Sequence, residues 1–185
     1  MGNVILTMQL SLDGVVSDEN RWMMLSEEIL EDYLAYYNTV DTIIVGKNTY
    51  ASLAQYWQQA EHSTNSLERA IAKRMNEIPK AVISHSEVDL IWQNSRALVV
   101  KDEETLAREL TALKNQVNHI SVESGVRTWQ SFIQQGLYDV LWLFVHPVIA
   151  SEGEHLFASA DKQQSLRLIR SKTYRNGVVS LHYQK

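Results

Sequence analysis

Two glycines stand where a predicted buried strand ends and a predicted helix begins, and each has a hydroxyl and a cation close behind it. The first junction, residues 43–49, contains Gly46, Lys47, Asn48 and Thr49. The second, residues 120–128, contains Ser124, Gly125, Val126, Arg127 and Thr128. Because a helix N-terminus exposes free N–H groups and glycine permits close backbone approach, both junctions suit the pyrophosphate of a nucleotide cofactor.

A third predicted strand end, at residues 83–86, adds the polar side chains of Ser84, His85 and Ser86. These groups suit a ribose or its 2′-phosphate. In an open α/β sheet, ligands bind outside the carboxyl ends of the strands, so the three strand ends are expected on one edge. The alternative is that the glycines only form tight turns and the hydroxyls only cap helices. The G-x-G-x-x-G fingerprint is absent, so a Rossmann site has no motif support.

The hydrophobic period switches repeatedly between strand-like and helix-like, which predicts one α/β domain over residues 1–185. Helices are expected after Ser26, after Gly46, at 67–75, after Asp102 and at 126–133, with Gly136 as a terminating residue and 58–65 as loop. Strands are expected at 4–10, 42–45, 81–83, 97–100, 120–122, 140–145, 166–174 and 178–183. Asn176-Gly177 joins the last two segments and predicts a hairpin. We therefore expect a mainly parallel sheet with an antiparallel C-terminal hairpin.

The composition excludes several classes of function. The formal net charge is −5 and no lysine- or arginine-rich run occurs, so nucleic acid is not an expected partner. The chain has no cysteine, which excludes disulfides, thiolate catalysis and cysteine-ligated metals. The N-terminus does not resemble a signal peptide, and no apolar stretch reaches the roughly 20 residues of a membrane helix. We expect a cytoplasmic protein that does not bind membranes.

Several motifs occur in an order that identifies a family resemblance. They are Ser-Leu-Asp-Gly at 11–14, Trp22, the segment 41–50, Val-Glu-Ser-Gly at 122–125, Gly-Leu-Tyr-Asp at 136–139 and His-Pro-Val-Ile at 146–149. Together they resemble the dihydrofolate-reductase-like superfamily, and more closely the C-terminal reductase domain of bifunctional riboflavin-biosynthesis enzymes. The resemblance covers nearly the whole chain.

This resemblance implies a three-layer α/β/α fold that binds NADPH in an extended conformation. Carried over by motif, residues 46–49 would hold the phosphates, and Ser84 and His85, with Ser86 as a further candidate, would lie near the adenosine ribose. Residues 124–128 would bind the pyrophosphate and the nicotinamide side. Dihydrofolate reductases have a cis Gly-Gly peptide at the corresponding junction, so the resemblance also predicts a cis Ser124–Gly125 bond.

The sequence departs from the family pattern in three places. Lys47 stands where arginine is usual, which keeps the charge but loses the bidentate fork. The deaminase half with its cysteine zinc ligands does not appear in the sequence, so a stand-alone reductase domain is expected. The Asp-x-Pro-x-Leu-x-x-Arg segment that would bind the phosphorylated riboflavin precursor is replaced by residues 51–63. The sequence therefore keeps the cofactor half of the family pattern and lacks the segment for the riboflavin substrate.

Asp13 is the candidate for a catalytic, substrate-orienting carboxylate, because it follows the first predicted strand; alternatively it is an Asx-turn residue before Gly14. Trp22 either lines the substrate pocket or anchors its loop. Dihydrofolate reductases use a carboxylate on the first helix, where this chain has Glu27, Glu28, Glu31 and Asp32. These acids are more readily interpreted as surface charges. No metal site is expected, since the histidines and acids around His146 and His155 match no ligand pattern.

The sequence thus predicts an NADPH-dependent reductase of a small heterocyclic substrate, resembling 5-amino-6-(5-phosphoribosylamino)uracil reductase. A dihydrofolate or pterin reductase is one alternative. A non-catalytic nucleotide-binding protein that kept the fold is another. A serine hydrolase is disfavoured because no Gly-x-Ser-x-Gly elbow occurs. A homodimer is expected, since the apolar C-terminal strands leave an edge that can pair with a second copy.

Overall fold

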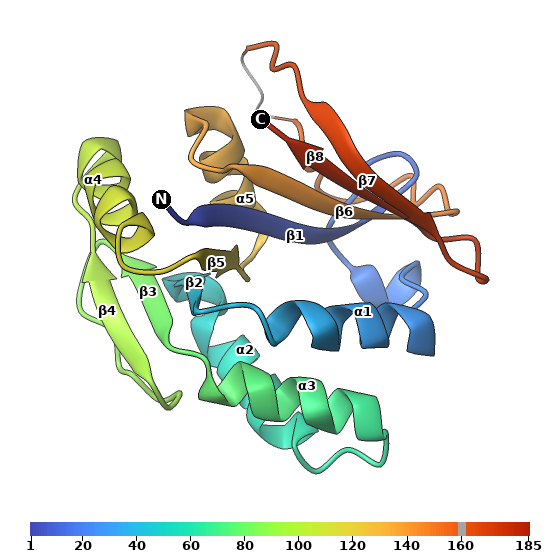
Figure 1. Ribbon diagram of the computed structural model, residues 1–185, viewed down its shortest axis with the longest axis horizontal. Coiled ribbons are helices and arrows are strands. Elements are labelled where there is room, and N and C mark those ends of the chain that lie inside the picture. Colours follow the sequence, from blue (N-terminus) through green and yellow to red (C-terminus); the bar gives the residue numbers. More distant parts are fainter. Residues whose placement is uncertain (159–161) are drawn as a thin grey trace. The chain divides into compact units, whose positions relative to one another are not determined.

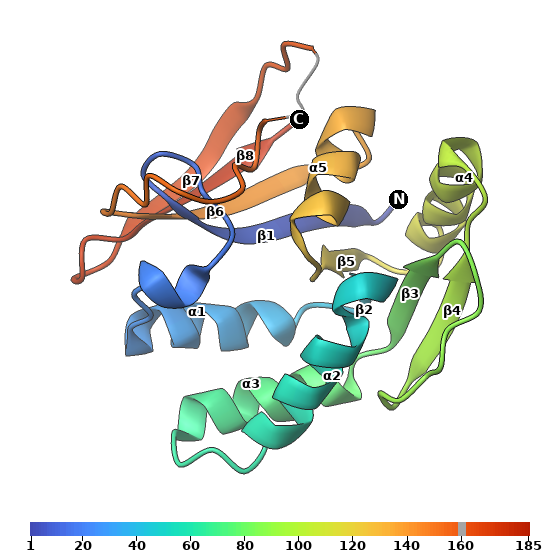
Figure 2. The same cartoon turned by 180° about the vertical axis from the view of Figure 1, so that it is seen from behind.

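The computed structural model describes residues 1–158 and 162–185, and these form two compact units (Figures 1 and 2). The first unit comprises Met1–Asn3 and Glu27–Gly125. The second comprises Val4–Ser26 and Val126–Lys185. The chain passes from the first unit to the second at the Gly125–Val126 bond. The expectation of one domain over the whole chain stays a prediction.

Four parallel strands form the sheet of the first unit, in the order β4-β3-β2-β5. The strands are β2 (Thr42–Gly46), β3 (Lys80–Ser84), β4 (Ser95–Val99) and β5 (His119–Val122). The helices are α1 (Glu27–Tyr37), α2 (Lys47–Ala60), α3 (Ser66–Glu77) and α4 (Glu103–Lys114). Strand β2 is apolar and buried along its length, as expected for a central strand covered on both faces.

The helices of the first unit cover both faces of its sheet. The α2–α3 connection leads from β2 to β3 in one direction, and α4 leads from β4 back to β5 in the other. Because such crossovers are right-handed, the reversal puts α4 on the face opposite α2 and α3. Both views show this arrangement (Figures 1 and 2). The three layers expected from the family resemblance are therefore present within this unit.

The ends of the helices follow local capping chemistry. The Asp102 carboxylate accepts the Thr105 N–H at 2.7 Å, which confirms the predicted N-cap of α4. Helix α2 continues to Ala60, so the loop predicted at 58–65 is shorter than expected. That loop ends at Asn65, whose side chain accepts two N–H groups of the first turn of α3. The prediction missed this cap because the polar run concealed the last turn of α2.

A buried polar network lies beside the apolar core of the first unit. Lys80 is 1% exposed, and its Nζ donates to the carbonyl of Asn76 at 2.6 Å and to that of Gln93 at 3.2 Å. The same Nζ lies 4.4 Å from the centre of the Trp92 ring. The Asn76 amide in turn accepts the Trp92 indole N–H and donates to Glu61. Burial lowers the pKa of Lys80 to about 7, because removing the ammonium group from water disfavours its charged form.

The second unit contains β1 (Asn3–Ser11), β6 (Val140–His146), β7 (Arg167–Thr173), β8 (Val179–Gln184), the short 3-10 helix η1 (Glu19–Arg21) and α5 (Val126–Gln135). Strands β1 and β6 are parallel, whereas β8 is antiparallel to both β6 and β7. The predicted hairpin is confirmed, with Gly177 at φ +87° in its turn. Helix α5 ends at Gly136, whose φ of +67° suits its predicted terminating position.

His146, at the end of β6, anchors the loop that follows β1. Its Nδ1 accepts the Met24 N–H at 3.0 Å, so the ring is neutral with its proton on Nε2, which donates to Gln9 Oε1 at 2.5 Å. The Trp22 ring meets the imidazole edge-on at 5.4 Å. Burial lowers the pKa of His146 to about 4. Both ring nitrogens are therefore used, which leaves neither for a metal ion.

Strand β7 is the edge strand of the second unit (red in Figure 1). Leu168 and Ile169 are each about half exposed, and the register of the β7–β8 pair shifts between Leu168 and Arg170. Bulges and cationic side chains on an edge strand oppose pairing with another strand. These features of β7 disfavour the edge-to-edge strand pairing on which the homodimer prediction is based. The homodimer stays a prediction. Within 1–158 and 162–185, no helix is both long and apolar enough to span a bilayer.

Lys80→Met should remove a pH dependence of stability. The folded pKa of about 7 lies below the ordinary 10.5, so between these values the unfolded state binds more protons and the free energy of unfolding rises with pH. Urea titrations from pH 7 to 9 measure this effect. We expect the free energy of unfolding to rise with pH more steeply in the wild type than in Lys80→Met, by up to about 1.4 kcal/mol per pH unit. Equal slopes would show that Lys80 is charged in the folded protein.

His146→Phe should destabilise the second unit by about 1–3 kcal/mol, because the Met24 N–H and Gln9 Oε1 lose their partner. The lowered pKa means that the wild type also loses stability as pH falls from 6.5 towards 4, since the unfolded imidazole is protonated first. The variant should lack this part of the acid sensitivity in denaturant titrations. His155→Phe, at an exposed position of the same unit, is the control and should behave like wild type.

Candidate functional site

The carboxyl ends of β2 and β5 lie side by side in the first unit, where the direction of the connections reverses. Such a switch point is where α/β sheets bind ligands. The Gly46 N–H donates to Ser124 Oγ at 3.0 Å, and Ser124 Oγ lies 3.2 Å from Thr49 Oγ1. We call Gly46, Thr49, Ser124 and Gly125 the junction cluster. The structure thus brings together residues that the sequence assigned to two separate junctions.

Gly125 is required in the junction cluster for space. A Cβ at this position would lie 2.7 Å from Thr49 Cγ2, closer than two non-bonded carbon atoms approach one another. The Ser124–Gly125 peptide bond is trans, so the predicted cis bond is wrong. The trans form avoids the roughly 3 kcal/mol of a non-proline cis peptide. Unlike the first glycine of the dihydrofolate reductase Gly-Gly pair, Ser124 also has a side chain, and its hydroxyl is bonded across the junction.

Lys47, in the first turn of α2, reaches the end of β3. Its Nζ donates to Ser86 Oγ at 2.7 Å and to the Glu87 carbonyl at 2.9 Å. Lys47, Asn48, His85 and Ser86 are all exposed. Two of the three predicted strand ends therefore meet around one lysine, which fits the binding of an anionic group.

The other two predicted residues at this strand end are engaged locally. Ser84 is buried, and its hydroxyl accepts the Ser86 N–H at 3.1 Å. The Nδ1 of His85 lies 2.8 Å from the Val100 carbonyl, which leaves Nε2 for a ligand. Ser84 shapes the turn, whereas His85 and Ser86 present polar atoms to solvent.

Val126, Arg127 and Thr128 form the first turn of α5, the helix that opens the second unit after Gly125. Arg127 is exposed, and the N–H groups of a first helical turn have no acceptor within the helix. This turn therefore offers a second set of N–H donors with a cation among them, as the sequence predicted for a pyrophosphate site.

Glu123 is the ionisable residue that the sequence did not assign to the site. It stands between β5 and Ser124, and its carboxyl accepts Ser121 Oγ at 2.5 Å and a hydrogen bond from Tyr37. Burial raises its pKa to about 7, against the two hydrogen bonds, which lower it. A carboxyl that still holds a proton near neutral pH is suited to general acid catalysis. The signal in the sequence was the two-residue spacing to Ser121, which puts both side chains on one face of β5.

Asp13 lies in the second unit, where its carboxylate holds a loop. Its oxygens accept Ser11 Oγ at 2.6 Å and the N–H groups of Ala150 and Ser151, each at 2.9 Å. The hydrogen bond from Ser11 is the largest cause that lowers the pKa of Asp13, to about 2. The carboxylate is thus ionised at neutral pH. It can orient a neighbouring group but holds no proton to donate.

Trp22 anchors its loop, as one of the two interpretations expected. The ring is 5% exposed, and its N–H donates to the Ser17 carbonyl at 2.9 Å. It therefore offers little surface to a substrate.

The four acids of α1 divide into two pairs. Glu27 and Glu31 are exposed, which agrees with their interpretation as surface charges. Glu28 and Asp32 are partly buried and have partners within the protein. In the described part of the chain, no three histidines or acids are grouped to hold a metal ion.

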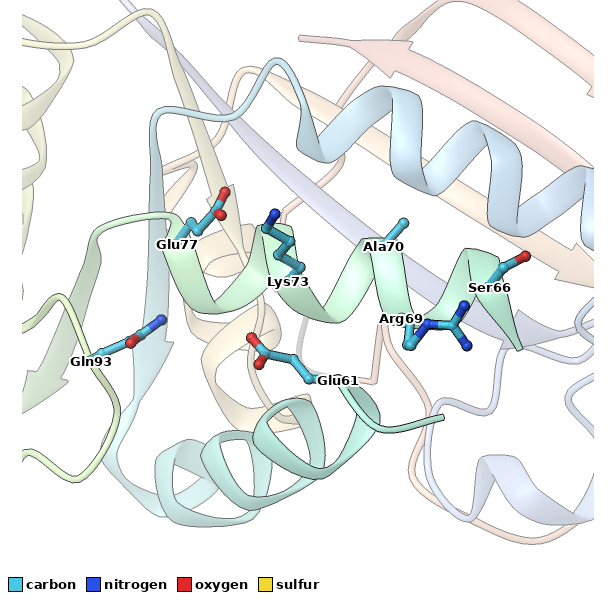
Figure 3. A pocket seen from close by; sticks show the side chains of 7 residues that line it. All are labelled: Glu61, Ser66, Arg69, Ala70, Lys73, Glu77 and Gln93. Carbon is cyan, nitrogen blue, oxygen red and sulfur yellow. The ribbon is translucent and has the colours of Figure 1, made fainter. Parts of the chain in front are cut away.

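A shallow hollow of about 430 Å³ lies along α3 in the first unit (Figure 3). Its lining is of mixed charge: Glu61, Ser66, Arg69, Ala70, Lys73, Glu77 and Gln93. None of the residues predicted for the cofactor or the substrate lines it. The hollow instead borders the Lys80 network through Glu61 and Gln93, both of which bond to Asn76.

Solved structures of the same fold include reductases. A putative riboflavin biosynthesis protein from Shewanella sp. PV-4 matches with a TM-score of 0.73 and 18% identity, covering 98% of both chains. The riboflavin biosynthesis reductase of Saccharomyces cerevisiae matches with a TM-score of 0.61 and 16% identity, covering 99% of this chain and 89% of that one. These likenesses confirm the α/β fold class predicted from the sequence.

The sequence itself has relatives over nearly its full length. YyaP, an uncharacterized protein of Bacillus subtilis, is 26% identical over 184 residues, which cover 97% of this chain and 93% of that protein. Residues 3–180 match the family described as RibD C-terminal domain. The resemblance drawn from the ordered motifs is thereby confirmed, and the chain belongs to the RibD C-terminal domain family.

Proposed function

We propose that this protein is an NADPH-dependent reductase of a small heterocyclic substrate with an imine-like carbon–nitrogen bond. The observation that carries the proposal is the junction cluster at the switch point of the first unit, with Lys47 beside it. Family membership supports a reductase, and a solved relative from Thermotoga maritima is named a deaminase and 5-amino-6-(5-phosphoribosylamino)uracil reductase.

The residues present fit an anionic dinucleotide. The first turn of α2 provides N–H donors after Gly46, Lys47 provides a cation, and Gly125, without a Cβ, lets Thr49 pack closely where β5 ends. In the proposal, residues 46–49 with Ser124 and Gly125 hold the phosphates, and the cofactor contacts of Val126, Arg127 and Thr128 stay a prediction. His85 and Ser86, with Lys47 bonded to Ser86, receive the ribose and its 2′-phosphate.

Bound NADPH would supply a hydride to the carbon of the reducible bond. The protein needs no nucleophile for such a reaction and contributes orientation and a proton. Glu123 is the group we assign to hold that proton, on its carboxyl, and to donate it to the substrate nitrogen. Asp13, ionised and bonded to Ala150 and Ser151, orients the substrate-side loop and stays the candidate for orienting the substrate.

The substrate is proposed as a pyrimidine of the riboflavin pathway, with a pterin as the alternative. Helix α2 runs unbroken from Lys47 to Ala60, where the phosphate-binding segment of riboflavin reductases was expected. That difference favours a substrate without the same phosphate group. An assay of NADPH oxidation against pyrimidine and pterin imines tests the proposal. Binding of NADPH without turnover on any of them would favour the non-catalytic nucleotide-binding alternative.

Lys47→Met should reduce the preference for NADPH over NADH. Its Nζ is the cation beside Ser86, and a charge-assisted hydrogen bond contributes about 1.5–3 kcal/mol, or about 10–100-fold in Kd. We expect calorimetric titration to give a weaker NADPH complex and an unchanged NADH complex. Lys73→Met, at an exposed position on α3, is the control. An unchanged ratio of the two dissociation constants would place the 2′-phosphate elsewhere.

Gly125→Ala should both destabilise the protein and abolish cofactor binding, and Thr49→Ser separates the two effects. The new Cβ would meet Thr49 Cγ2, so removing that methyl should restore the melting temperature while keeping the Thr49 hydroxyl contacts. In the double variant NADPH should still fail to bind, because the Cβ blocks backbone approach. A double variant that binds NADPH like wild type would show that Gly125 does not contact the cofactor.

A further inference from the structure

Two hydroxyl groups bond to the carboxyl of Glu123 in the first unit, and a third hydroxyl bonds to one of these two. Tyr36 Oη donates to Ser121 Oγ at 2.8 Å, and Ser121 Oγ donates to Glu123 Oε1 at 2.5 Å. Tyr37 supplies a further hydrogen bond to the same carboxyl. Both tyrosines lie on α1, and Ser121 lies on β5. The donors run in one direction, from α1 through the strand to Glu123.

The two ends of this chain of hydroxyls differ in their access to water. Ser121 is 0% exposed, whereas Tyr36 is partly exposed. Tyr37 is buried and stacks on Tyr33 with ring centres 5.8 Å apart. Water can therefore reach the tyrosine end of the chain while the serine in the middle stays dry.

The surroundings of the carboxyl are uncharged. The groups facing it are the phenols of α1 and the serine of β5, and burial is the largest cause of its raised pKa. The nearest tyrosine on α2, Tyr50, uses its hydroxyl on the backbone of Trp92. Hydroxyl donors stabilise the carboxylate by hydrogen bonding, so they oppose burial and set where the carboxyl titrates.

We propose that Tyr36, Ser121 and Tyr37 form a hydroxyl relay that aims the Glu123 carboxyl and returns a proton to it from the α1 side. This inference rests on the proposed role of Glu123 as the acid. After Glu123 has donated its proton, Ser121 Oγ–H passes its proton to Oε1, and Tyr36 Oη–H passes its own to Ser121. Tyr36 then takes a proton from solvent. Three O–H bonds form, three break, and no electrons are exchanged.

The first test uses the cofactor-free protein. The carbon-13 shift of the Glu123 carboxyl, assigned with Glu123→Gln, is followed against pH. Tyr37→Phe and Ser121→Ala each remove a donor to the carboxylate, so the pKa of Glu123 should rise by about 0.4–1 unit. Tyr33→Phe makes the same chemical change on the same helix and should leave the pKa unchanged. If the pKa of Glu123 is unchanged in both Tyr37→Phe and Ser121→Ala, these hydroxyls do not orient the carboxyl and that part of the proposal is overturned.

The second test separates the first turnover from later ones. In Tyr36→Phe assayed at pH 6, below the pKa of Glu123, the carboxyl starts mostly protonated, so the first turnover with NADPH and substrate should match wild type while kcat falls severalfold and KM stays constant. Equal kcat in Tyr36→Phe and wild type would overturn the return of the proton. If the carboxyl shifts occur but the wild type neither binds nor oxidises NADPH, the proposed function fails and the proton return fails with it. Only the orientation of the Glu123 carboxyl by hydroxyl groups would then remain.

Discussion

The hydroxyl of Ser124 is the contact on which the candidate site depends. It accepts the Gly46 N–H and lies against Thr49 Oγ1, so it ties the exit of β5 to the start of α2. This tie requires a glycine at 125, because the neighbouring methyl of Thr49 leaves no room for a Cβ. It also holds the first turn of α2 where Lys47 reaches Ser86 on the next strand. One short polar contact thus aligns donors from three strand ends.

Burial shifts the side chains of Lys80, His146 and Glu123 towards their neutral forms. Lys80 donates to carbonyls, His146 is held between an N–H and an amide oxygen, and Glu123 accepts hydroxyls. Neutral partners satisfy hydrogen bonds without the desolvation of a second charge. Lys80 and His146 stabilise the core and a loop. Of the three, Glu123 stands next to the junction cluster, directly before Ser124.

The two units carry different parts of the family pattern. The first unit keeps the glycine junctions, although lysine replaces arginine and Ser124 replaces a glycine. In the second unit, Asp13 of the Ser-Leu-Asp-Gly motif accepts the N–H groups of residues 150 and 151. These hydrogen bonds account for an aspartate at this position without any role in proton transfer. The continuous helix α2 replaces the segment that would bind a substrate phosphate.

The sequence by itself determined the elements, the hairpin at Asn176-Gly177 and the family, because periodicity, turn residues and motif order are local properties of the chain. It also indicated Gly46 and Gly125 as close-approach positions. Only the tertiary structure decided what surrounds Glu123, since its relay begins at Tyr36, 85 residues from Ser121. The same holds for Asp13, whose partner Ala150 is 137 residues away, and for the trans bond at Gly125. Protonation and hydrogen bonding depend on neighbours in space, and no local pattern encodes those neighbours.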